Sequence, residues 1–214
     1  MIDVDDAALA VTKALASGDA DAVDAARVIY LEVESRGAIA ADMRYRLGLS
    51  RLFRHKDTAG AIELFKDAAA EKSAPVANEA RVSLALLLSS TGKRQQAIFE
   101  LKKMLPEWVS PSVHTAQALD FLSVLLRESK AQHKDIIAND ETRKLHLKVL
   151  ADGTSNGVEK AHYLLRLAAA WADGGSGVEN AAARKVYDDV IKLGPKAGAE
   201  AVALAKASQK SLPR

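Results

Sequence analysis

Apolar residues recur along most of the chain at the spacing of an α-helix that buries one face. The pattern i, i+1, i+4, i+7, i+8 is clearest twice, in Ala61, Ile62, Phe65, Ala68, Ala69 and in Ala97, Ile98, Leu101, Met104, Leu105. Between residues 80 and 88, apolar side chains lie nearly all round the predicted helix, so we expect it to be covered on both sides. An alternation of one-faced and two-faced helices is typical of a stacked helical array.

Glycines and capping residues divide this pattern into separate helices. Ser176 with Glu179 has the spacing of a capping box, and Asn156 with Glu159 has a weaker form of it. Gly194-Pro195 is a strong stop signal. These marks predict about eleven helices, near 4–16, 20–35, 38–54, 58–72, 76–91, 94–105, 111–128, 131–151 (broken near Asn139), 157–173, 178–193 and 196–210.

The two central pairs of helices repeat one another. Leu47-Gly48 corresponds to Leu84-Ala85 after a shift of 37 residues, and Phe65 corresponds to Leu101 after a shift of 36. Small residues at positions 48, 61, 85 and 97 would let two helix backbones approach closely, and the large residues would fill the space beside them.

This frame resembles the tetratricopeptide repeat (TPR), whose first helix carries a Leu-Gly pair and whose second helix has a small, a bulky and a small residue in turn. The Sel1-like repeat is a close competitor, since Ala68-Ala69 and Leu84-Ala85 suit its pattern too. The chain departs from the TPR pattern in lacking the signature Trp of the first helix, and in the position of Pro75 and Pro106.

The resemblance implies an all-α fold, a right-handed α-solenoid of antiparallel helix hairpins in which residues 1–214 form one TPR-like domain. The best-matched repeats are 41–72 and 78–105. Divergent repeats are expected at 5–35, 111–151 and 157–193, with a capping helix at 196–210.

The family also implies a function, which is to bind a protein or peptide on the concave face formed by the first helix of each pair. Carried over to the two best repeats, this face contains Tyr45, Arg46, Leu49, Glu79, Val82, Ser83 and Leu86. The mixture of side chains predicts an apolar or extended ligand with a few polar contacts, and it does not match the Lys/Asn pattern that clamps a C-terminal carboxylate.

Sequence motifs for catalysis, cofactors or metals are lacking. There is no cysteine, and Gly92-Lys93 lacks the other residues of a phosphate loop. Residues 152–157 imitate the start of a calcium loop, but Tyr163 stands at the twelfth position in place of the bidentate Glu. We therefore expect a non-enzymatic adaptor or scaffold without cofactor or metal.

Charge is uneven along the chain. The net charge is +2, yet residues 1–42 hold nine acidic and three basic residues. Association between an acidic N-terminal and a basic C-terminal surface, giving a self-assembling structural protein or homo-oligomer, is the alternative function. A solvated helix face with uneven charge is the simpler interpretation.

The basic stretch Lys130–Lys148 also contains His133 and His146. It lacks interleaved aromatic residues and holds local acids, including Asp140 four residues before Lys144, so a solvated helix face is expected and no nucleic acid. Trp108 either closes the preceding hairpin or is exposed as an anchor for a partner. The N-terminal residues lack the pattern of a secretory signal and no apolar run is long enough to span a bilayer, which predicts a cytoplasmic protein without membrane insertion.

Overall fold

The computed structural model describes residues 2–104 and 112–213. The chain divides into two compact units, which we call the N-terminal unit (1–104) and the C-terminal unit (105–214). The described residues are helical nearly throughout and contain no strand, which confirms the predicted all-α fold. The expectation of one repeat domain over 1–214 stays a prediction.

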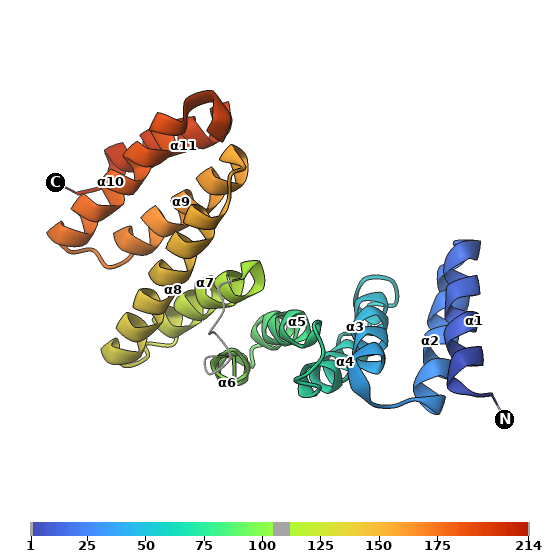
Figure 1. Ribbon diagram of the computed structural model, residues 1–214. Helices are drawn as coiled ribbons and strands as arrows, with labels where there is room; N and C mark the ends of the chain where they lie inside the picture. Colours follow the sequence, from blue (N-terminus) through green and yellow to red (C-terminus); the bar gives the residue numbers. More distant parts are fainter. Residues whose placement is uncertain (1, 105–111, 214) are drawn as a thin grey trace. The chain divides into compact units, whose positions relative to one another are not determined.

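The N-terminal unit consists of three helix hairpins (Figure 1), and its helices are α1 (Val4–Ser17), α2 (Ala20–Val33), α3 (Gly37–Phe53), α4 (Thr58–Ala70), α5 (Ala77–Ser90) and α6 (Arg94–Lys102). Each helix packs along the next one in the chain. This is the consecutive packing that the TPR-like repeat predicts.

The hairpin of α3 and α4 depends on the absence of a side chain at Gly48. A Cβ atom there would lie 2.7 Å from Cε1 of Phe65, closer than real Cβ contacts. Phe65 is fully buried in this space, and the ring of Tyr45 packs against it at a tilt of 45°, with 5.5 Å between the ring centres. In the next hairpin, Ala85 and Leu101 are fully buried at the corresponding positions. The burial of these residues is in line with the predicted equivalence of the two hairpins, which itself stays a prediction.

Small residues also join the two hairpins to each other. Ala68, Ala69 and Ala80 form a buried cluster between α4 and α5, with Tyr45 packed against it. Arg81 of α5 is buried beside them and donates a hydrogen bond of 2.8 Å to the carbonyl oxygen of Ala69. The α3–α4 and α5–α6 hairpins therefore lie side by side, as the shift of 36 to 37 residues predicts.

The C-terminal unit is built in the same consecutive manner (Figure 1), from α7 (Val113–Glu128), α8 (His133–Gly153), α9 (Gly157–Ala172), α10 (Gly177–Leu193), the short 3-10 helix η2 (Gly194–Ala197) and α11 (Ala199–Ser211). Its apolar core lies mainly between α8, α9, α10 and α11. The predicted capping box of Ser176 and Glu179 starts α10, and Asn156 caps α9.

The predicted break near Asn139 is wrong, since α8 runs through it without interruption. The Asn139 side chain is buried and donates to the carbonyl oxygen of Leu119 on α7, at 3.2 Å, instead of competing for its own backbone. Trp108 and Pro106 lie outside the described residues. Among the helices that the structure describes, none combines the length and the apolar character needed to cross a bilayer.

Candidate partner-binding face and a charged cavity

The α3 part of the predicted face has one exposed and two half-buried residues. Arg46 is exposed, and its Nε lies 2.7 Å from a carboxylate oxygen of Asp42, one helical turn earlier. Leu49 is half-buried. Tyr45 is half-buried because its ring packs on Phe65, so much of its surface serves the fold.

The α5 part contributes Glu79, Val82, Ser83 and Leu86. The first three are half-buried, and Leu86 is 49% exposed. The hydrogen bond and charge of Asp42 raise the pKa of Arg46, and the charge of Glu79 adds to this effect. Residues of α3 and α5 meet in one apolar cluster, in which Ala41 and Tyr45 of α3 pack with Ala77 of α5.

Further apolar side chains on α3 were missed in the sequence analysis. Ile39 and Phe53 are 58% and 65% exposed, and they lie seven residues before and after Arg46. Seven residues are two helical turns, so Ile39, Arg46 and Phe53 share one side of α3. Extending the helical period from Arg46 in both directions would have found them. A pocket of 340 Å³ lies beside Ile39, lined also by Ala38, Asp42, Pro75 and Val76.

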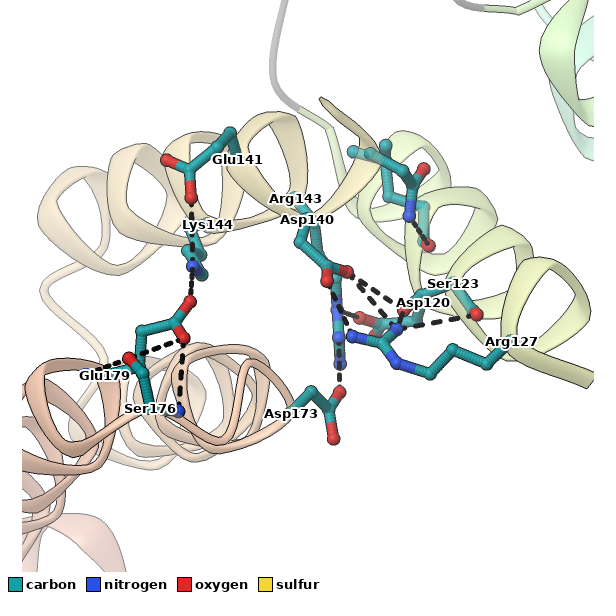
Figure 2. A network of polar contacts seen from close by, with 12 residues as sticks. Asp120, Ser123, Arg127, Asp140, Glu141, Arg143, Lys144, Asp173, Ser176 and Glu179 are labelled. Carbon is teal, nitrogen blue, oxygen red and sulfur yellow. Dashed lines mark hydrogen bonds and ion pairs between the residues drawn. The ribbon is translucent and has the colours of Figure 1, made fainter. Parts of the chain in front are cut away.

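The C-terminal unit contains a charged cavity of 490 Å³, which sequence reasoning did not predict. It lies beside α8 and the connection from α9 to α10, and its lining consists of Arg127, Ile136, Ile137, Asp140, Glu141, Lys144, Asp173, Gly174, Ser176 and Glu179. Four carboxylates and two cations therefore face one space. Figure 2 shows most of these side chains with their ion pairs.

Arg143 joins three helices behind the cavity. It is only 7% exposed and forms ion pairs with Asp120 of α7 and, at 2.8 Å, with Asp173 at the end of α9. Burial by itself disfavours the charged guanidinium, but the charges and hydrogen bonds of Asp120 and Asp173 outweigh burial and raise the pKa of Arg143. Asp120 also pairs with Arg166 of α9, at 2.6 Å.

Lys144 makes the second link, between α8 and the other side of the cavity (Figure 2). Its Nζ lies 3.0 Å from Glu141 and 3.2 Å from Glu179 of α10. The same ammonium group lies 4.0 Å from the ring centre of Trp171, a cation–π contact. A hydrogen bond from Ser176, followed by the contact with Lys144, lowers the pKa of Glu179.

Arg127 of α7 and Asp140 of α8 make a third link. Nη2 of Arg127 lies 2.6 Å from Asp140, whose other oxygen accepts a hydrogen bond from Ser123 at 3.0 Å. Each buried carboxylate of the cavity is thus paired with a cation. Glu179 has a lowered pKa, whereas a general base that works near neutral pH needs a raised one. The pairs of Asp140 and Glu179 link α7 to α8 and α8 to α10 across the cavity.

The prediction that the basic stretch Lys130–Lys148 forms a solvated helix face is wrong for its central residues. Arg143, Lys144 and His146 are buried. The expected pair of Asp140 with Lys144 is replaced by pairs across helices, Asp140 with Arg127 and Lys144 with Glu179. The acidic partners lie up to 35 residues away in sequence, which local charge spacing cannot reveal. Among the described residues, no group of three potential metal ligands lies close enough to hold an ion.

No protein-family model and no curated protein sequence matches the chain. The solved structures that resemble it include two at 16% sequence identity. A TPR repeats protein from Bacteroides fragilis has a TM-score of 0.44, with 99% of this chain and 98% of that chain covered. BtubC from P. vanneervenii has a TM-score of 0.48, with 99% and 92% covered. At these TM-scores and this sequence identity, neither structure indicates a function for this chain.

Proposed function

We propose that the chain is a non-catalytic, cytoplasmic adaptor that binds a protein or peptide along α3 and α5. The binding residues would be Tyr45, Arg46, Leu49, Glu79, Val82, Ser83 and Leu86, on the face that the TPR-like repeat assigns to the ligand.

The observation that carries this proposal is the combination of exposed apolar and charged side chains on helices that are themselves tightly packed. Leu86 and Ile39 are about half exposed, and Asp42, which pairs with Arg46, lines a pocket beside Ile39. Exposed apolar side chains with a few fixed polar groups are what a peptide-binding surface needs. The hairpins beneath hold Phe65 and Leu101 fully buried, so the face rests on a rigid support.

The packing of Tyr45 decides which residues can be substituted to test this face. Tyr45 packs on Phe65, so its replacement would disturb the fold as well as the surface. The double variant Arg46→Glu with Leu86→Asp alters exposed side chains only. Phe99→Asp is the matched control, since Phe99 is 62% exposed on α6, outside the predicted face.

The experiment is affinity purification from the source cell with wild-type, double-variant and control proteins, followed by quantitative mass spectrometry. A specific partner should be retained by the wild type and by Phe99→Asp, and lost from Arg46→Glu/Leu86→Asp. Purified partner should then bind the wild-type protein directly. Equal recovery on all three proteins would contradict the assignment. Light scattering at low ionic strength separates this proposal from self-assembly, because a monomer excludes the latter.

A further inference from the structure

A second surface, formed by exposed apolar side chains, follows one side of α8. Ile137, Leu145 and Val149 are 47%, 60% and 46% exposed. They lie with the exposed Glu141 at intervals of four residues, so the four side chains form one continuous ridge along the helix. A ridge of this kind is a typical docking element for a partner helix.

The ridge borders the charged cavity. Ile137 and Glu141 belong both to the ridge and to the lining of the cavity. A volume of 490 Å³ lies within the range of about 300–1,000 Å³ that is usual for ligand sites. The surface therefore offers an apolar contact and a polar recess next to each other.

The lining of the cavity holds more acidic than basic side chains. Four carboxylates and two cations line it, and both cations are held by carboxylates of the protein. The described contacts of Glu141 and Asp173 each use one oxygen, toward Lys144 and Arg143 respectively. One acceptor oxygen of each remains for a ligand, and these two side chains are the more exposed carboxylates of the lining, at 62% and 43%.

The net charge of the C-terminal unit does not favour the binding of a cationic ligand. Residues 105–214 contain thirteen acidic and fifteen basic residues, and Lys134 and Lys148 are exposed on the same side of α8. A basic ligand is therefore not attracted to the unit as a whole. A preference for a basic ligand must therefore come from the carboxylates that line the charged cavity.

We propose that the α8 ridge and the adjoining cavity form a second docking surface, for a peptide segment that places an apolar side chain on Leu145 and Ile137 and inserts an arginine or lysine side chain beside Glu141 and Asp173. This surface is separate from the α3/α5 face and does not depend on its function.

The test uses fluorescence anisotropy with three labelled helical peptides. They share two leucines and differ at one position, one turn away, which is Arg, Gln or Glu. The proteins are the full-length wild type, Leu145→Ser and Glu141→Gln. Matched controls are Leu204→Ser, where Leu204 is 53% exposed on α11, and Glu200→Gln, where Glu200 is exposed on α11. Circular dichroism verifies that each variant is folded.

We expect the wild type to bind the Arg peptide about tenfold more tightly than the Glu peptide. Leu145→Ser should weaken all three peptides alike, by about fivefold, because it removes only apolar contact. Glu141→Gln should weaken the Arg peptide alone, by about threefold. Both controls should bind like the wild type.

Three results would overturn the proposal. The first is equal affinity of the wild type for the Arg and Glu peptides. The second is an equal loss on Leu145→Ser and Leu204→Ser, which indicates non-specific apolar binding. The third is no binding of the Arg peptide at about 1 mM, a concentration that would detect even weak association.

Discussion

The α3–α6 hairpins and the α7–α10 hairpins have the same consecutive helix packing, yet different residues hold their helices together. In α3–α6, Gly48 and Ala85 bring backbones together around the buried Phe65 and Leu101. In α7–α10, the buried cations Arg143 and Lys144 join helices through carboxylates. One architecture thus tolerates both kinds of interface.

Two arginines show what this difference means for function. Arg46 pairs with an acid on its own helix and stays exposed, so it remains free to meet a ligand. Arg143 pairs with acids on two other elements and is buried, so its charge supports the fold. Among the described charged residues of α3–α6, Arg81 alone is buried, whereas the C-terminal unit buries Asp140, Arg143 and Lys144.

The largest effect is expected for Phe65→Ala in the apolar hairpins. Removing a fully buried ring that fills the space above Gly48 should lower the free energy of unfolding by about 3–5 kcal/mol. Urea unfolding followed by circular dichroism measures this change. A loss well under about 1 kcal/mol would show that α3 and α4 do not depend on this contact.

Arg143→Met should cost somewhat less, about 2–3 kcal/mol, because it removes the cation that pairs with Asp173 and leaves Asp120 with Arg166 alone. We expect a smaller loss of stability than for a fully buried ion pair, because both carboxylates are partly exposed to water. The same denaturation experiment on Arg46→Met is the control, with an expected change of about 0.5 kcal/mol or less. Similar losses for the two arginines would remove the distinction drawn between them.

Gly48→Ala tests the close approach of α3 to α4. The added methyl group meets the ring of Phe65, so we expect a destabilisation of about 1–3 kcal/mol although alanine favours helices. Ala85→Gly, at the equivalent position, should cost about 1 kcal/mol for a different reason, the loss of helix propensity. A stabilising Gly48→Ala would mean that the ring moves aside without cost.

The smallest effect concerns the pH dependence of the Lys144–Glu179 link. The pKa of Glu179 is lowered in the folded protein, first by Ser176 and then by Lys144. Its contribution is therefore complete above the unfolded glutamate pKa of about 4.3 and is lost as the pH falls through the lower folded value. Glu179→Gln should lower the melting temperature at pH 7, and the difference from wild type should shrink toward pH 3. A constant difference would argue against the ion pair.

The fold could be predicted from the sequence where the determining residues are close together in the chain. The helical period and the capping box at Ser176 are local patterns, and the structure confirms them. The match of Gly48 with Ala85 is a simple repeat in the sequence, and both positions are buried. The residues of the α3/α5 face came from the repeat frame, so their role in binding stays a prediction.

The charged network could not be predicted because its partners are distant in sequence. Lys144 meets Glu179 and Arg143 meets Asp173 only after α8, α9 and α10 have packed. Local spacing instead favoured the pair of Asp140 with Lys144, but Asp140 pairs with Arg127 and Lys144 with Glu141 and Glu179. Asn139 was misjudged for the same reason, since its partner, the carbonyl oxygen of Leu119, belongs to another helix.

The most direct test of the central claim, that α3 and α5 carry the partner-binding face, is site-specific photo-crosslinking in the source cell. A photoreactive phenylalanine analogue replaces either Leu86 on α5 or Phe99 on α6, both exposed in the free protein. We expect a discrete protein adduct at position 86 and none at position 99. No adduct at position 86, or the same adduct at both positions, would contradict the claim.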